Sequence, residues 1–312
     1  MRVATFRTGG RERLGVLRGE RMVDVALAAE RLERGDLAGA ASGMLALIAG
    51  GEEALAVVAE VVDQAQDAAP DALLPLDTVE LLAPIPRPRK NVFCVGRNYA
   101  EHAAESLRAI GQEVKLPQFP NIFTKAVTAV TGPTSNIVIV PEVSERIDWE
   151  VELAVIIGPG GRSIAREDGL HHVWGYTILN DVSARDLQNR PGVQWFIGKS
   201  LDGSCPMGPW IVTADELPDP TNLRLRLLVN GVVKQEDTTA HMIFDIPTLL
   251  ADISRGMTLE PGDILATGTP AGVGFARTPP EFLRPGDLME SEIEGIGTMR
   301  NHVVAKGETA GG

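Results

Sequence analysis

From Asn91 onward the chain is a succession of short β-branched runs separated by glycine and proline, and this pattern limits the folds open to it. The runs are NVFCVG, NIVIVP, VELAVIIG, GYTILNDVS, PWIVT, LRLRLLVNGVV, DILATGT and LMESEI. Short runs rich in Val and Ile and bounded by turn residues are typical of β-strands. Because few helical patterns separate them, they predict a rolled or sandwiched sheet with a few helices.

The segment before Asn91 has a different character. It opens with three strand-like runs, RVATFR, RLGVLRG and RMVDVA, and then becomes rich in Ala and Leu, which predicts helix from about Leu37 to Ala68. A proline-rich connection follows at 83–90 and reads as a boundary between structural units. We therefore expect an α+β fold, mainly β, with a small N-terminal α+β domain at 1–84 and a larger domain at 88–308.

The composition argues against several classes of partner. A formal net charge of −13 and an aromatic content of 4% disfavour nucleic acid, because phosphates would be repelled and few rings are available to stack on bases. The longest apolar stretch, at 43–62, is broken by Gly-Gly-Glu-Glu, so no membrane span is expected. Two cysteines in unlike contexts and an N-terminus without a signal-peptide pattern predict a cytoplasmic protein.

Two glutamates interrupt the apolar run DWEVELAVIIG. Side chains alternate between the faces of a strand, so Glu150 and Glu152 point the same way. An exposed edge strand with a solvated acidic face would explain them, and so would a divalent-cation site. Asp181, which follows the apolar run GYTILN, offers a third carboxylate at a strand end. Three oxygen ligands leave room for water and a chelating substrate, which is how Mg²⁺ or Mn²⁺ usually binds.

The segment NYAEHAAESLRAIG is predicted to form a helix that begins at Asn98, with Glu101 completing a capping box, and ends at Gly111. His102 and Glu105 are three residues apart and therefore lie on one face of this helix. A carboxylate that hydrogen-bonds an imidazole fixes its tautomer and raises its basicity, as a general base requires. A surface His–Glu pair of little consequence would have the same spacing.

Further polar residues have two interpretations each. Lys199, among bulky apolar residues in WFIGKSLDGSCPMGPW, either faces a metal and an anionic substrate or is a surface lysine with its stem on apolar neighbours. The segment ATGTPAGVG, with its N–H groups and two hydroxyls, fits an anion-binding nest or a plain hairpin turn. Positive charge for a dicarboxylate substrate, or for surface ion pairs, is available from Arg97, Lys125 and Arg185.

Taken in order, CVGRNYAEHAAE, DWEVELAVIIG, GYTILNDVSARDLQ, WFIGKSLDGSCPMGPW and LEPGDILATGTPAGVG resemble the fumarylacetoacetate hydrolase family over roughly Asn91 to Val304. The N-terminal part resembles, more loosely, the small extra domain of longer members. The late segment RTPPEFLRPGDLMESEIEGIGTMRN is similar to the branch of fumarylacetoacetate hydrolase domain-containing protein 2.

The resemblance implies a mixed β-sandwich roll, a homodimer, and Mg²⁺ or Mn²⁺ held by Glu150, Glu152 and Asp181. It implies that His102 and Glu105 form an acid–base dyad on a lid helix and that Lys199 is a catalytic lysine. The residues expected to contact substrate are Arg97, Tyr99, Lys125, Arg185, Gln188, Thr267, Gly268 and Thr269.

The expected activity is that of a metal-dependent enzyme on a small anionic 2-oxo or 2,4-dioxo acid. Hydrolysis of a C–C bond in an acylpyruvate or fumarylpyruvate is the first expectation, with His102 taking a proton from water. Without an attacking water, the same residues would serve decarboxylation or keto–enol tautomerisation of oxaloacetate, or isomerisation of hydroxymuconate-type compounds. A purely structural cation is the alternative of another class, and the open coordination of three carboxylates favours the enzyme.

Overall fold

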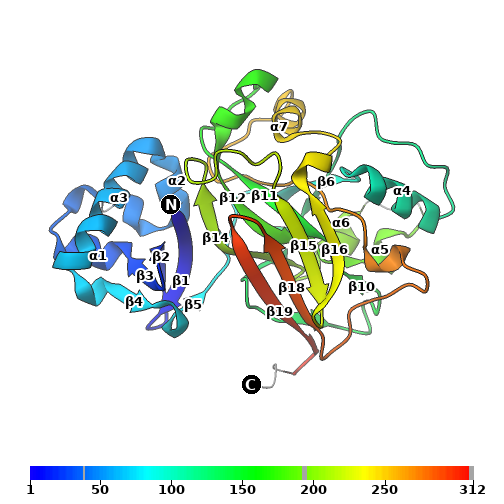
Figure 1. Ribbon diagram of the computed structural model, residues 1–312, viewed down its shortest axis with the longest axis horizontal. Coiled ribbons are helices and arrows are strands. Elements are labelled where there is room, and N and C mark those ends of the chain that lie inside the picture. Colours follow the sequence, from blue (N-terminus) through cyan, green and yellow to red (C-terminus); the bar gives the residue numbers. More distant parts are fainter. Residues whose placement is uncertain (38, 192–194, 309–312) are drawn as a thin grey trace.

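The computed structural model describes residues 1–37, 39–191 and 195–308 (Figure 1). Its α-helices are α1 (Val25–Arg31), α2 (Met44–Ala49), α3 (Gly51–Ala68), α4 (Ala100–Ala109), α5 (Arg185–Gln188), α6 (Phe196–Lys199) and α7 (Ile246–Ser254). Its first strands are β1 (Arg2–Thr8), β2 (Arg11–Arg18), β3 (Arg21–Asp24), β4 (Leu73–Pro75), β5 (Glu80–Leu81), β6 (Val92–Gly96), β7 (Asn121–Lys125), β8 (Val130–Thr131) and β9 (Ile137–Ile139). The remaining strands are β10 (Ile147–Asp148), β11 (Val151–Ile157), β12 (Val173–Asn180), β13 (Ser183–Ala184), β14 (Cys205–Thr213), β15 (Arg224–Val229), β16 (Val232–Thr238), β17 (Ile264–Ala266), β18 (Leu288–Ile293) and β19 (Gly297–Ala305).

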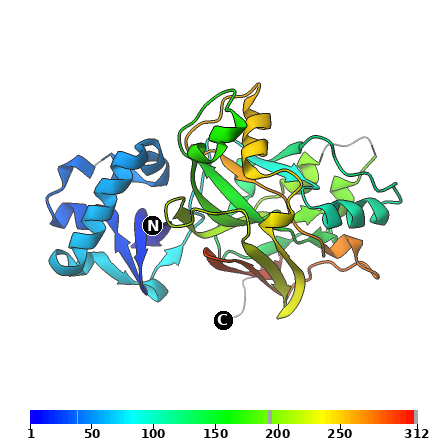
Figure 2. The same cartoon turned by 45° about the horizontal axis from the view of Figure 1, so that its top comes forward.

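A large sheet of 12 strands runs through the whole molecule in the order β4-β3-β2-β1-β14-β12-β11-β17-β6-β7, with β5 beside β1 and β8 beside β14. A second sheet of five strands has the order β16-β15-β18-β19-β9. Figure 2 shows the second sheet packed across the part of the large sheet that contains β11 and β12. The predicted mainly-β sandwich roll is therefore confirmed.

The central strand β11 is buried along its full length, because it is covered on both faces. Leu153 and Val155 belong to the core between the two sheets, which also contains Leu225, Leu227 and Met289. Ala154 and Ile156 belong to a second core on the opposite face, which extends into the N-terminal helices. Alternation along one strand thus joins two cores.

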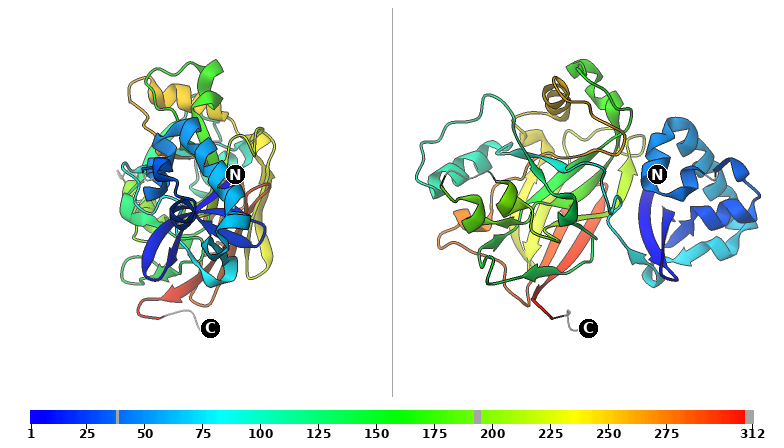
Figure 3. Two further views of the ribbon diagram at one scale, coloured as in Figure 1. Left: turned by 90° about the vertical axis from the view of Figure 1, so that its left-hand side faces the viewer. Right: turned by 180° about the vertical axis from the view of Figure 1, so that it is seen from behind.

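The N-terminal segment forms a lobe to one side of the molecule, with its helices on one face of β1 to β3 (Figure 1, Figure 3). The three predicted strands are present as β1, β2 and β3. The predicted helix from Leu37 to Ala68 is instead divided into α2 and α3, because the chain turns at Gly50, between the two helices, and at Gly51, the first residue of α3, which has a φ of +63°. The helix α1 was not predicted.

β1 pairs with β14 in antiparallel register, so the large sheet continues from the N-terminal lobe into the rest of the chain. The division at 84 to 88 therefore stays a prediction about which parts could fold independently. Within the described residues, no helix combines the length and the apolar character that spanning a membrane requires.

Candidate active site and metal centre

Three carboxylates meet where β11 begins and β12 ends. Asn180, the last residue of β12, pairs with Val151, and the Asp181 N–H donates to the Glu150 carbonyl oxygen at 2.8 Å. This register places Asp181 beside the two glutamates. Glu150, Glu152 and Asp181 are buried, and each offers an oxygen atom within 4.8 Å of the others. Since β11 lies between β12 and β17, the alternative of a solvated edge strand is wrong.

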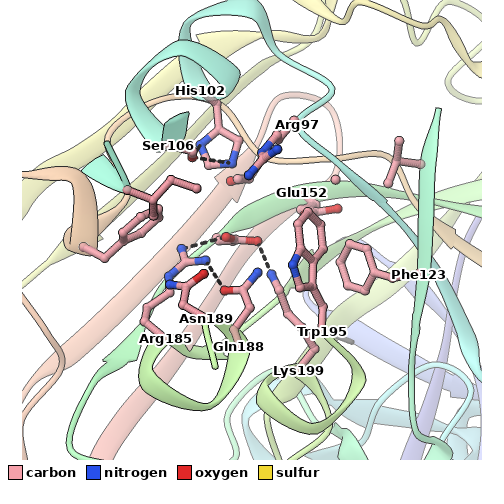
Figure 4. Close-up of a pocket in the computed structure, with 16 residues that line it drawn as sticks. Arg97, His102, Ser106, Phe123, Glu152, Arg185, Gln188, Asn189, Trp195 and Lys199 are labelled. Atoms are coloured by element: carbon pink, nitrogen blue, oxygen red, sulfur yellow. Dashed lines mark hydrogen bonds and ion pairs between the residues drawn. The ribbon is translucent and has the colours of Figure 1, made fainter. Parts of the chain in front are cut away.

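Three cations contact this carboxylate group, as Figure 4 shows in part. Lys199 Nζ lies 2.7 Å from Glu150 Oε2 and 2.7 Å from Asp181 Oδ2. Arg185 Nη2 lies 2.7 Å from Glu150 Oε1. Lys125 Nζ lies 2.8 Å from Asp181 Oδ1. All three are buried, so these ion pairs are hardly screened by solvent.

Glu152 is the carboxylate without a cationic contact within the described residues, and it accepts the Gly268 N–H at 2.7 Å. Burial, with the charges of Asp181 and Glu150, raises the pKa of Glu152 well above its usual value. Burial also opposes ionisation of Glu150, but Lys199 and Arg185 outweigh it and lower the pKa of that carboxyl.

The residues present fit a divalent cation. With all four ionised, the buried carboxylates of Asp148, Glu150, Glu152 and Asp181 exceed the three buried cations by one negative charge. A grouping of carboxylate oxygens is the donor set that Mg²⁺ and Mn²⁺ prefer. Glu150, Glu152 and Asp181 would hold the ion. Its positive charge would balance the negative charge of Glu152, which no cation of the described residues contacts.

The predicted His–Glu pair is formed on α4. His102 Nδ1 lies 3.1 Å from Glu105 Oε1, and His102 is buried. The Glu105 carboxylate accepts N–H groups from Gly272 at 3.0 Å and from Val273 at 3.4 Å. An ionised carboxylate only accepts, so we assign the Nδ1 proton to His102, which leaves Nε2 able to take a proton.

The predicted start of α4 is wrong and its predicted end is confirmed. The Asn98 side chain does not cap the helix; its amide donates to the carbonyl oxygens of Thr267 and Phe244 instead. At the other end the Gly111 N–H bonds the Arg108 carbonyl and the Gln112 N–H bonds the Leu107 carbonyl, with Gly111 at a φ of +71°. This is a Schellman C-cap.

The glycine-rich loop at 267–275 is an anion nest for the protein's own carboxylates. Its backbone N–H groups bind three of them: Gly268 binds Glu152, Gly272 and Val273 bind Glu105, and Gly274 and Phe275 bind Asp148. The hydroxyls of Thr267 and Thr269 donate to the carbonyl oxygens of Leu153 and Val151 in β11. One loop therefore fixes both Glu105, the partner of His102, and Glu152 of the carboxylate group.

A cavity of about 40 Å³ opens above the carboxylate group. Of the residues predicted to act there, those lining it are Arg97, His102, Glu150, Glu152, Arg185, Gln188, Lys199 and Thr269. Gln188 Oε1 accepts Arg185 Nη1–H at 2.9 Å, which fixes both side chains at the wall.

Four residues predicted to contact substrate do not line this cavity: Tyr99, Lys125, Thr267 and Gly268. Lys125 is fully buried, and its ammonium contacts Asp181, Ser204 and the carbonyl oxygens of Val182 and Lys199. Tyr99 is also fully buried, and burial raises the pKa of its hydroxyl. In this structure none of these four residues faces the cavity in which a substrate would contact them.

Several residues at the site were not predicted. The Phe123 ring lies 5.1 Å from Lys199 Nζ and packs edge-on against Trp195. Asp148 is fully buried and accepts Arg185 Nε–H at 2.8 Å. A sequence signal for Asp148 existed, because it lies two residues before Glu150 and continues the same acidic alternation. The aromatic residues had no comparable signal.

The sequence profile of the family described as fumarylacetoacetate (FAA) hydrolase C-terminal matches residues 91–304. The chain belongs to the fumarylacetoacetate hydrolase family. It is 49% identical over 228 residues to the oxaloacetate tautomerase YisK of Bacillus subtilis, a match covering 73% of this chain and 74% of that protein. It is 45% identical over 261 residues to the mitochondrial oxaloacetate tautomerase Fahd2a of Rattus norvegicus, covering 84% and 79%.

Among solved structures of the family, the maleylpyruvate hydrolase of Sphingobium sp. SYK-6 has a TM-score of 0.75 and 33% identity, over 98% of this chain and 99% of that one. That structure contains manganese(II) and pyruvate. The predicted family, the predicted branch and the prediction of an enzyme are confirmed. Glu150, Glu152 and Asp181 form a carboxylate group that could hold a metal ion, and the structure of the Sphingobium relative contains manganese(II).

Proposed function

We propose that this family member is a metal-dependent keto–enol tautomerase of small 2-oxo acids, with oxaloacetate as its substrate. The observation that carries the proposal is the combination of one buried acid–base residue, His102, with a three-carboxylate cation site in a cavity of about 40 Å³. The names of the relatives from Bacillus subtilis and Rattus norvegicus support the same reaction.

Tautomerisation requires little more than this cavity contains. A proton leaves the carbon next to the carbonyl and a proton reaches the carbonyl oxygen, so no second reactant has to be bound. One general acid–base group and a means of stabilising the enolate oxygen are sufficient. C–C hydrolysis also requires a placed water and a longer substrate.

The chain's residues divide this work. When bound, the divalent ion would act as a Lewis acid that stabilises negative charge on the carbonyl oxygen. His102 Nε2 takes the proton from carbon and returns it to oxygen, while Glu105 stabilises the imidazolium through Nδ1. Lys199 adds positive charge beside the same oxygen. Burial disfavours the charged form of Lys199, but the charges of Asp181 and Glu150 outweigh burial and raise its pKa, so the ammonium stays protonated.

Hydrolysis of an acylpyruvate-type substrate is the second candidate, and it was the first expectation from the sequence. The maleylpyruvate hydrolase of Sphingobium sp. SYK-6, which aligns over nearly the whole chain, favours it. The two tautomerase relatives are more similar in sequence, so the order of the two candidates is reversed. A homodimer and a cytoplasmic location stay predictions.

The test is turnover of enol oxaloacetate with Mg²⁺ or Mn²⁺, followed by loss of the enol absorbance, beside acylpyruvates followed by loss of substrate. We expect tautomerisation by the parent protein and a fall in kcat of about 100-fold or more in His102→Ala, the size of a general acid–base contribution. The control is His171→Ala, since the His171 side chain is 84% exposed.

Mn²⁺ affinity is expected to be equal in all three proteins, because His102 is not in the carboxylate group. Turnover of acylpyruvates without tautomerisation of oxaloacetate would reject the proposal in favour of hydrolysis. Equal kcat in His102→Ala and the parent would remove His102 as the base.

A further inference from the structure

Three cations line the cavity or lie beneath it in contact with carboxylates, and Arg97 differs from them. Lys125, Lys199 and Arg185 each contact at least one buried carboxylate of the protein. Arg97 has no carboxylate at ion-pairing distance anywhere in residues 1–37, 39–191 and 195–308, and burial alone lowers its pKa. A half-buried guanidinium without an acidic partner is costly unless a ligand supplies the partner.

The backbone holds Arg97 in a defined place. It follows Gly96, the last residue of β6, and has a φ of +59°. For a residue other than glycine this left-handed conformation costs about 1 kcal/mol or more and persists only where neighbours impose it. Asn98 imposes it here, because its side chain is bonded to Thr267 and Phe244 and is fully buried.

The side chain is supported as well. The Arg97 guanidinium lies 5.6 Å from the centre of the Trp195 ring, a cation–π distance. Trp195 packs so closely on Gly96 that a Cβ there would lie 2.3 Å from the ring. The aromatic ring therefore restricts where the guanidinium can go, while leaving its N–H groups free of carboxylates.

Arg97 lies where the cavity meets solvent. It lines the cavity of about 40 Å³ and also an adjoining outer cavity of about 440 Å³, which Arg190 and Gln112 line too. Figure 4 shows Arg97 beside His102, across the cavity from Arg185 and Lys199. A 2-oxo acid whose carbonyl end lies at the carboxylate group would extend its other end toward this guanidinium.

We propose that Arg97 binds the second carboxylate of a 2-oxo dicarboxylic acid and selects such substrates over 2-oxo monocarboxylic acids. The inference rests on the proposed tautomerase function and adds the residue that sets its substrate class. A guanidinium presents two parallel N–H groups that match the two oxygens of a carboxylate. Arg185, the other arginine of the cavity, is already bonded to Asp148, Glu150 and Gln188.

The experiment compares oxaloacetate with its C4 methyl ester, which lacks the second charge. In Arg97→Gln, kcat/KM for oxaloacetate is expected to fall by about 10- to 100-fold, the value of a hydrogen bond to a charged group, mainly through KM. The value for the ester is expected to stay within about twofold of the parent. Arg97→Lys, which keeps the charge, should recover part of the loss for oxaloacetate alone.

The matched control is Arg162→Gln, which removes an exposed guanidinium that lines neither cavity and should change kcat/KM for neither substrate. Folding is verified by circular dichroism, and the metal site by Mn²⁺ affinity. Equal losses for oxaloacetate and the ester in Arg97→Gln would overturn the role of Arg97 and leave the tautomerase intact. Absence of oxaloacetate turnover in the parent would overturn the proposed function itself.

Discussion

Replacing Asp148 with Asn tests whether the buried charge network supports the site. The Asp148 carboxylate accepts N–H groups from Trp149 at 2.8 Å, Gly274 at 2.7 Å and Phe275 at 3.0 Å, and Arg185 Nε–H at 2.8 Å. An asparagine has one acceptor oxygen, and its NH₂ group would face donors that it cannot bond. The substitution also removes the negative charge that the buried Arg185 guanidinium contacts.

The expected loss of stability depends on the ion pair that Arg185 would keep after the substitution. Removing one partner of a buried ion pair costs about 3–5 kcal/mol, and we expect the lower end because Arg185 retains Glu150 at 2.7 Å. A loss of about 3 kcal/mol in the free energy of unfolding corresponds to a fall in Tm of about 5 °C for 312 residues, at an unfolding entropy of about 2.1 cal/mol/K per residue. Turnover should fall too, because Arg185 helps to hold Glu150 in place.

The assay is thermal and urea unfolding followed by tryptophan fluorescence, since Trp149 is buried beside the substituted residue. The matched control is Asp168→Asn, where the side chain is 60% exposed and the change should stay within about 0.5 kcal/mol. If Asp148→Asn unfolds within about 1 kcal/mol of the parent, the network is not what stabilises this part of the molecule.

Two further predictions concern the metal and the cavity wall. Removal of divalent ions with a chelator should abolish turnover but leave the circular dichroism spectrum unchanged, because two extensive cores hold the sheets together. Unfolding on chelation would instead mean that the ion is structural. Gly96→Ala should lower stability by about 1–3 kcal/mol and raise KM for oxaloacetate, because its Cβ would lie 2.3 Å from the Trp195 ring. Gly35→Ala, with no atom within 4 Å of the added Cβ, is its control, and equal effects of the two substitutions would contradict the argument.

The grouping of Glu150, Glu152 and Asp181 was predictable because it depends on two simple regularities. Alternation along a strand places Glu150 and Glu152 on one face, and strand ends bring polar residues such as Asp181 together. The His102–Glu105 pair follows equally simply from the spacing of residues on a helix. In each case the relevant partner is close in sequence or fixed by a strand register.

Other features depend on partners distant in the sequence, which spacing does not reveal. Asn98 has the residue type of a helix cap, but backbone carbonyls 146 and 169 residues away compete for its amide. Lys125 has the charge that a dicarboxylate requires, but Asp181 binds it first. The division of the helix predicted for Leu37 to Ala68 has a local cause, the Gly50–Gly51 pair, which the Ala- and Leu-rich composition concealed.

The glycine-rich loop has a consequence for any attempt to redesign this enzyme. Because the main chain of 267–275 binds both Glu105 and Glu152, the His102–Glu105 pair and the carboxylate group are held at a set separation by peptide groups. Exchanging side chains cannot alter that separation. Adapting the enzyme to a longer or shorter reactant would require a loop of different length or path, with both centres moved together.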